Sequence, residues 1–225
     1  MARFKDHEKA IILRKQGMSY SQIKKILKVS KSTLSTWLKD YSLPEERVRQ
    51  LRDWSEQRIE RCRKTKRRKK EKRLEGFYQE QKKLILPLNK RELYLAGLFL
   101  YWGEGSKSRM NSSLSISNTD PAVIKFFISW LTKSLFVPKK KIKILLHLYK
   151  DMDVKEEIKF WSDILKIPPQ QFYKPYIKKS LLKSINHKGG FGHGTCNIRI
   201  GNARLSEKTL MALKVISDKY NKMRT

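Results

Sequence analysis

The sequence predicts an α+β protein, with helices in its first part and a mixed domain with an antiparallel sheet in its second part. Up to residue 87, apolar residues recur at helical spacing, and residues 45–75 contain neither proline nor glycine. Beyond residue 87, apolar helical stretches are separated by short segments in which apolar and polar residues alternate, as in strands. No apolar run of ~18 residues and no N-terminal apolar signal segment is present, so we expect a cytoplasmic chain without a membrane partner.

Residues 7–41 predict two short helices on either side of a tight turn, preceded by a helix over residues 6–16 that ends at Gly17. Two helices that cross at a steep angle need apolar residues where they pack. The corresponding positions are all apolar here: Ile23, Leu27, Val29, Leu34 and Trp37. Ser30 or Ser32 can cap the second helix, because a hydroxyl accepts hydrogen bonds from its free backbone N–H groups.

The outward positions of that second helix carry short hydrogen-bonding side chains flanked by positive charge, which suits a helix in the major groove: Lys31, Ser32, Ser35, Thr36 and Lys39. The segment resembles the helix-turn-helix of resolvases and transposases, which implies a DNA-binding domain over residues 1–43. The family usually has a small residue and a glycine where this chain has Lys24 and Lys28. A non-glycine residue at positive φ costs roughly 1 kcal/mol. An ordinary three-helix bundle shows the same apolar spacing and stays the alternative.

The charge of the chain points to a polyanionic partner. There are 52 Lys and Arg residues against 21 Asp and Glu residues, a formal net charge of +31. Such a field attracts nucleic acid at long range, but it also suits ribosomal proteins and membrane-surface binders, so charge alone does not identify the polyanion. Cys62 and Cys196 are too few and too isolated to indicate a disulfide framework.

Residues 44–87 are predicted to form a basic helical linker that begins after Pro44. Its middle, residues 61–73, holds ten basic residues and one acidic one. Like charges at helical spacing destabilise an isolated helix, so this part is expected to order on contact with phosphate. Two interpretations stay open: a solvated spacer, or an arm that follows the DNA backbone through Arg67, Arg68, Lys69 and Lys70.

The C-terminal part, residues 88–225, is predicted to contain helices and strands in alternation. Asn118 to Asp120 supply a helix cap, and Pro121 suits a first turn. The expected helices cover residues 92–103, 121–131, 154–165 and 206–220, and the expected strands cover residues 112–117, 141–149, 172–178 and 195–200. Trp130, Trp161, Phe126 and Phe160 are interpreted as core residues rather than base-stacking platforms, and His147 as a packed or edge histidine.

The first of these helices ends in Leu95-Ala96-Gly97-Leu98-Phe99-Leu100-Tyr101-Trp102-Gly103-Glu104-Gly105. Small residues followed by an acid and a glycine resemble the signature of the LAGLIDADG homing-endonuclease family, over roughly residues 90–222. The resemblance implies helix, hairpin, helix, strands and helix, with the sheet lying on DNA. It also implies that two such helices pack closely at a two-fold axis in a homodimer. Glu104 would then hold Mg²⁺ at the scissile phosphate.

The chain departs from that signature in three ways. Two extra residues lie between the LAG start and the acid, residues 154–165 add a helix, and one copy of the motif is visible. The fold also occurs in DNA-binding proteins that do not cleave, such as WhiA-type regulators, which combine a LAGLIDADG-like domain with a helix-turn-helix. Lys107 and Arg109 follow Glu104 and are candidates for phosphate contacts.

We therefore predict a sequence-selective protein for double-stranded DNA, either a transcription regulator or part of a mobile element, associated with the nucleoid. The alternative is an active Mg²⁺-dependent homing-type endonuclease centred on Glu104. RNA is a weaker third candidate, because an RNA major groove is too deep and narrow for a helix-turn-helix. No cofactor is certain. The spacing of His187, His193 and Cys196 gives only a weak indication of zinc.

Overall fold

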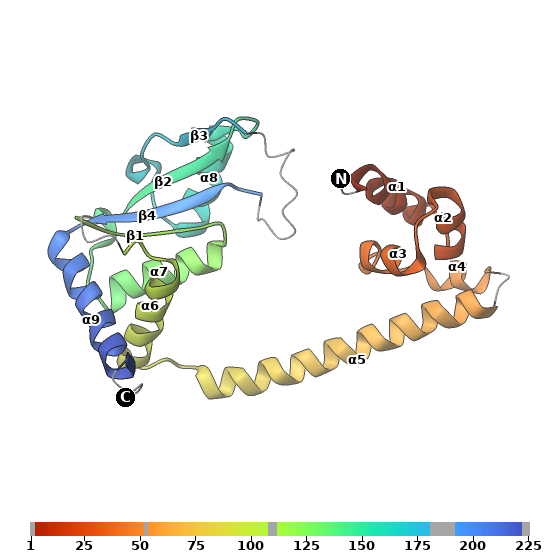
Figure 1. Ribbon diagram of the computed structural model, residues 1–225, viewed down its shortest axis with the longest axis horizontal. Helices are drawn as coiled ribbons and strands as arrows, with labels where there is room; N and C mark the ends of the chain where they lie inside the picture. The colour runs from red at the N-terminus through yellow and green to blue at the C-terminus, as the bar shows by residue number, and fades with distance from the viewer. Residues whose placement is uncertain (1–2, 52–53, 108–111, 181–191, 222–225) are drawn as a thin grey trace. The chain divides into compact units, whose positions relative to one another are not determined.

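The computed structural model describes residues 3–51, 54–107, 112–180 and 192–221 (Figure 1). The chain divides into two compact units, Met1–Leu86 and Pro87–Thr225, and each is described by itself. Helices make up the first unit, and the second combines helices with a sheet, so the predicted α+β class is confirmed. Among the described helices, none is long and apolar enough to cross a membrane.

The first unit begins with three short helices: α1 (Phe4–Lys15), α2 (Tyr20–Leu27) and α3 (Lys31–Trp37). Their shared core contains Ala10, Tyr20, Ile23, Val29, Leu34 and Leu38. Ile23, Val29 and Leu34 are buried as predicted, whereas Leu27 and Trp37 pack against this core while only partly buried. The apolar spacing of the sequence therefore does identify the packing face of these helices.

Two turns between these helices use positive backbone φ. Gly17, at φ +86°, follows the end of α1, and its N–H donates to the Arg14 carbonyl. Lys28 ends α2 at φ 51° and ψ 36°, the left-handed conformation expected if the chain turns at this non-glycine position. Ser19 and Gln22 form a reciprocal capping box at the start of α2, and Ser30 accepts a 3.1 Å hydrogen bond from the Thr33 N–H at the start of α3.

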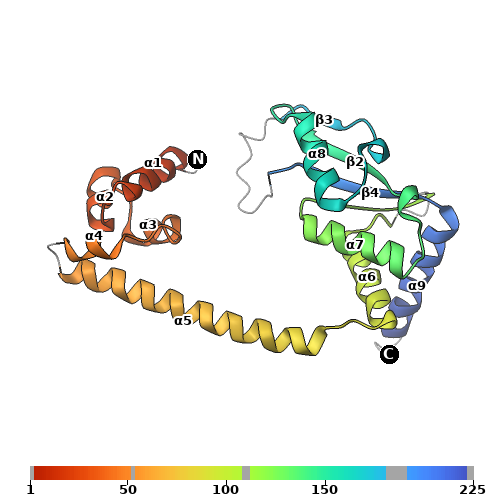
Figure 2. The ribbon, with the colours of Figure 1, turned by 180° about the vertical axis from the view of Figure 1, so that it is seen from behind.

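The predicted helix from residue 45 is in fact two helices. The short α4 (Glu45–Arg49) contributes Val48 to a small cluster with Leu43 and Leu51. After it, α5 (Trp54–Ile85) runs for 32 residues, ~48 Å at 1.5 Å per residue, and passes through Gly76 (Figures 1 and 2). Residues 61–73 are helical within α5, and an ion pair of 2.8 Å between Arg67 and Glu71 offsets part of the repulsion there.

The second unit has the order α6 (Lys90–Glu104), β1 (Ser113–Asn118), α7 (Pro121–Lys133), β2 (Lys143–Tyr149), α8 (Val154–Leu165), β3 (Tyr176–Lys178), β4 (Thr195–Gly201) and α9 (Ala203–Asn221). Short 3-10 helices cover Lys139–Lys141 and Pro169–Gln171. Between α6 and α7 lies the strand β1, and an antiparallel bridge pairs Ile116 of β1 with Gly105 just after α6, in the place where the resemblance implies a hairpin. Residues 108–111, where the turn would be, lie outside the described residues.

The strands form a sheet in the order β1-β4-β2-β3. The pairs β1–β4 and β2–β4 are antiparallel as predicted, but β2 and β3 are parallel. The parallel pair follows from the connection, because α8 crosses over between the two strands and returns the chain in the same direction. The strand expected from Phe172 begins only at Tyr176, after the 3-10 helix and Pro175, whose nitrogen has no hydrogen to donate to a ladder.

One face of the sheet carries the core. In β2 and β4 the buried residues alternate with less buried ones, and the buried set is Ile144, Leu146, Leu148, Cys196, Ile198 and Ile200. Residues from α6, α7, α8 and α9 share this core, and Figure 1 shows α6, α7 and α9 on one side of the sheet. Trp130 and Trp161 are fully buried, which confirms their interpretation as core residues.

Candidate nucleic-acid interface

The exposed side of α3 brings together four of the five residues predicted to read DNA. Lys31, Ser32, Thr36 and Lys39 are exposed, whereas Leu34 between them is buried against α1 and α2. The Thr36 hydroxyl donates to the Ser32 carbonyl at 3.3 Å, which leaves its oxygen able to accept. Lys39 lies in the turn just after the end of α3 at Trp37. This surface therefore presents two cations and two hydroxyls on a capped helix and the turn that follows it.

Ser35 differs from these four residues. It is half-buried, and its hydroxyl accepts a hydrogen bond from the guanidinium of Arg63 in α5. Its side chain is therefore engaged within the unit, and it is not part of the exposed set. The sequence places Ser35 on the outside of a two-helix motif, but the packing of a later helix decides its surroundings.

The start of α5 is joined to α1 by a buried ion pair that the sequence reading missed. Arg14 donates two hydrogen bonds of 2.9 Å to the carboxylate of Glu60, and the side chains are 1% and 9% exposed. The same guanidinium donates to the backbone carbonyls of Tyr41 at 2.9 Å and Met18 at 3.0 Å. No local pattern marked this pair, since Glu60 is one of three acids in residues 53–60. Buried acids in proteins are usually paired.

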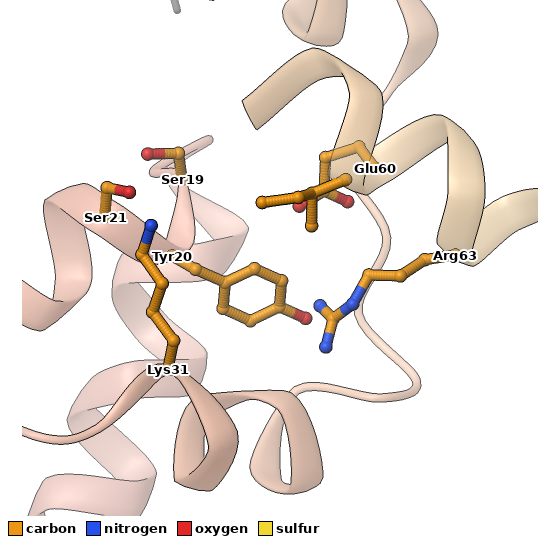
Figure 3. A pocket seen from close by; sticks show the side chains of 7 residues that line it. Ser19, Tyr20, Ser21, Lys31, Glu60 and Arg63 are labelled. Carbon is orange, nitrogen blue, oxygen red and sulfur yellow. The ribbon is translucent and has the colours of Figure 1, made fainter. Parts of the chain in front are cut away.

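A small cavity of about 110 Å³ lies where α2, α3 and α5 meet (Figure 3). It has room for a few water molecules, at ~30 Å³ of liquid volume each. The cavity marks the junction between these three helices. It is lined by Ser19, Tyr20, Ser21, Lys31, Ile59, Glu60 and Arg63.

The middle of α5 forms a long, exposed, basic surface. The predicted phosphate contacts Arg67, Arg68, Lys69 and Lys70 are all exposed, and Arg67 shares the carboxylate of Glu71. Nearer the start of α5, Lys64 donates a 2.6 Å hydrogen bond to Glu45 of α4, which holds the pKa of that carboxyl below its ordinary value. Surface ion pairs of this kind are worth little energy, so most of the positive charge of α5 stays available to a polyanion.

In the second unit, the face of the sheet opposite the core carries polar and basic side chains that sequence reasoning missed. We call it the outer sheet face; its residues are Ser117, Lys143, Leu145, His147, Asn197 and Arg199. Asn197 donates to the Ser117 hydroxyl at 2.6 Å, and Arg199 donates to that of Ser113 at 3.1 Å. The alternation within each strand was the signal, since every second residue of a half-covered strand points away from the core.

Two basic residues of the outer sheet face lie directly opposite each other. Lys143 of β2 is paired in register with Arg199 of β4. Like charges in this position destabilise an isolated sheet, and a bound anion would relieve the repulsion. Nearby, burial and the positive charge of Lys178 lower the pKa of His147, which favours its neutral form.

Glu104 is the last residue of α6 and is exposed. Mg²⁺ in nucleases is held by several oxygen ligands. Among the described residues, no group of three or more His, Cys, Asp and Glu side chains is placed to hold a metal ion. The residues around Glu104 therefore do not fit a Mg²⁺ site within one chain, and we assign no metal-dependent step to them.

The small residues around Glu104 have local structural roles. A Cβ built on Gly97 would lie 2.0 Å from the ring of Trp130. The absence of a side chain at Gly97 therefore makes room for Trp130 in the core of the same unit. A Cβ on Gly105 would lie 2.3 Å from the ring of Tyr101. Lys107 donates to the Trp102 carbonyl at 2.7 Å and so caps the end of α6, whereas Arg109 lies outside the described residues.

The two described residues of the weak zinc pattern, His193 and Cys196, have other surroundings. Cys196 is buried in the core, and burial raises the pKa of its thiol far above the ordinary value. The ring of His193 stacks on Phe160 with 3.5 Å between centroids, and its Nδ1 lies 2.9 Å from Glu157. His187 lies outside the described residues.

The sequence and structure were compared with family models, curated proteins and solved structures, and none of them matches this chain.

Proposed function

We propose that this protein binds double-stranded DNA and selects its site by sequence. The observation that carries the proposal is the exposed set of Lys31, Ser32 and Thr36 on a capped helix whose opposite face is buried, with the exposed Lys39 in the turn that follows it. An α-helix of this kind fits the B-DNA major groove, where lysines contact guanine and hydroxyls contact either purine or pyrimidine edges. A transcription regulator or a mobile-element protein would use such selectivity.

The charge distribution supports a second component of binding that does not depend on sequence. Exposed lysine and arginine side chains on α5 would contact phosphates, which every duplex carries, so they add affinity whatever the sequence. The outer sheet face, with Lys143 opposite Arg199, is the proposed contact of the second unit. These contacts would hold the protein on DNA while α3 samples base edges.

A homodimer is part of the proposal, with α6 as the candidate contact. Phe99 and Trp102 lie on its exposed side, 51% and 37% exposed, with their rings stacked 6.0 Å apart. A Cβ on Gly103 meets nothing within 4 Å, so another backbone can approach there. Exposed aromatic side chains are characteristic of the centres of protein interfaces.

Cleavage of DNA is the second candidate function. The observation behind it is the exposed carboxylate of Glu104 at the C-terminal end of α6, where the helix dipole disfavours a negative charge by ~0.3–1 kcal/mol. Such a position is tolerated at low cost, and the isolated carboxylate does not form a metal site. We therefore propose binding without cleavage.

The two candidates are separated by incubating the protein with a random duplex library in Mg²⁺ and, in parallel, in EDTA. We expect bound duplexes to be enriched equally in both, with intact ends. Site-specific double-strand breaks that require Mg²⁺ and disappear in Glu104→Gln would replace the binding proposal by the nuclease. Equal retention of every sequence would show that α3 does not read bases.

A further inference from the structure

The first three turns of α5 are tied to each of the four helices before it. Glu60 is bonded to Arg14 of α1, and Lys64 to Glu45 of α4. The Gln57 side chain donates to the Leu51 carbonyl at 2.6 Å, just after α4. Arg63 completes the set, because its guanidinium contacts α2 and α3 together.

Arg63 joins two elements that belong to the DNA-reading motif. Its Cζ lies 4.1 Å from the centroid of the Tyr20 ring, and its Nη2 donates to the hydroxyl of Ser35 on α3. Arg14 lies over the same ring at 4.4 Å. Tyr20 therefore contacts two guanidiniums, one from α1, which precedes it, and one from α5, which follows the motif.

These contacts fix the direction of the basic surface relative to α3. Because α5 is a continuous helix, Arg73 lies ten residues and ~15 Å along its axis from Arg63. On B-DNA, with 3.4 Å per base pair, that length corresponds to roughly four base pairs. Phosphate contacts made by this stretch therefore cannot shift independently of the bases under α3.

We propose that Arg63 is a positioning residue that sets the register between the bases read by α3 and the flanking phosphates bound by α5. The inference rests on the proposed DNA binding and adds to it a fixed composite footprint. Arginine is required because its planar fork can stack on Tyr20 and donate to Ser35 at once. A lysine ammonium is a compact charge without a planar group, so it cannot stack on Tyr20 while it donates to Ser35.

The test combines methylation interference, which reports contacts to bases, with ethylation interference, which reports contacts to phosphates, on a selected duplex with full-length wild type, Arg63→Met and Arg63→Lys. Arg68→Met is the matched control, since it removes one exposed cation of α5 without touching the contacts to Tyr20 and Ser35. Wild type should show base-centred interference plus a flanking block of phosphates at one fixed distance. Both Arg63 variants should keep the central signal and lose or spread the flanking block.

Arg68→Met should keep the position and sharpness of the flanking block, apart from the one phosphate that Arg68 contacts, and bind more weakly by a few-fold, with a salt slope reduced by about one. A flanking block that stays sharp and unmoved in Arg63→Met overturns the inference, as does a wild-type pattern in Arg63→Lys. Arg63→Lys keeps the positive charge, so it tests the role of the guanidinium even where Arg63→Met does not fold. Absence of any central signal in wild type would instead refute the proposed function.

Discussion

Thr36 and Ser35 are neighbours on α3, but their hydroxyls have different surroundings. The Thr36 oxygen is exposed and bonded only within its own helix, whereas Ser35 accepts a hydrogen bond from Arg63. Replacing Thr36 by alanine should therefore change the preferred DNA site at one base pair, with a loss of ~1–3 kcal/mol at that position. The measurement is selection from a random library followed by titration against single-base variants.

Ser35→Ala is the control for that experiment. It should leave the preferred bases unchanged, because its hydroxyl faces α5 rather than the exposed side of α3. A changed base preference in Ser35→Ala, with an unchanged preference in Thr36→Ala, would contradict the assignment of the reading side of α3.

The ion pair of Arg14 with Glu60 predicts a large stability effect at a single residue. Glu60→Gln leaves a buried guanidinium without its counter-charge, and breaking one side of a buried pair costs ~3–5 kcal/mol. Denaturant unfolding followed by circular dichroism should show this loss. Glu71→Gln removes an exposed pair with Arg67 and should cost at most ~1 kcal/mol. Similar losses in both variants would mean that the Arg14 pair is not buried in solution.

At the scale of elements, two helical glycines should respond oppositely to alanine. Gly76 of α5 has open space where a Cβ would be built, so Gly76→Ala should stabilise its part of the helix by ~0.5–1 kcal/mol. Hydrogen exchange of the surrounding amides should slow by a few-fold. Gly97→Ala drives a Cβ into the ring of Trp130 and should destabilise the second unit by ~1–3 kcal/mol. Faster exchange around Gly76→Ala would argue against a continuous helix there.

Elements defined by local chemistry were predictable from the sequence, and those defined by distant packing were not. Ser30 as a helix cap and Lys28 at positive φ follow from residues within one turn. The parallel pairing of β3, in contrast, depends on how α8 crosses the sheet. The docking of α5 through Glu60 depends on Arg14, 46 residues earlier, and no local pattern encodes such a pair.

The candidate site shows the same division. The exposed residues of α3 follow from helical periodicity, since a buried Leu34 determines which side faces outward. The outer sheet face could be recognised only once the register placed Lys143 opposite Arg199. Gly97 was expected to allow a second helix to approach, but the ring of Trp130 occupies that space. A glycine in a sequence indicates close approach without identifying the neighbour.

At the scale of the whole molecule, the net charge of +31 predicts strong dependence of binding on salt. Neutralising Lys69 and Lys70 together, as Lys69→Gln and Lys70→Gln, should weaken binding to every duplex by a similar factor. The slope of log affinity against log salt should fall by about two, since each lysine contributes about one phosphate contact. A loss confined to the preferred site would show that these lysines contact bases instead.

The most direct test of sequence-selective DNA binding is the ratio of two dissociation constants at physiological salt. One is measured for the duplex selected by the protein and the other for a scrambled duplex of equal length and composition. We predict that the selected duplex binds at least ~1,000-fold more tightly, as specific DNA-binding proteins do. Equal affinities, or a preference for single-stranded or double-stranded RNA, would contradict the account.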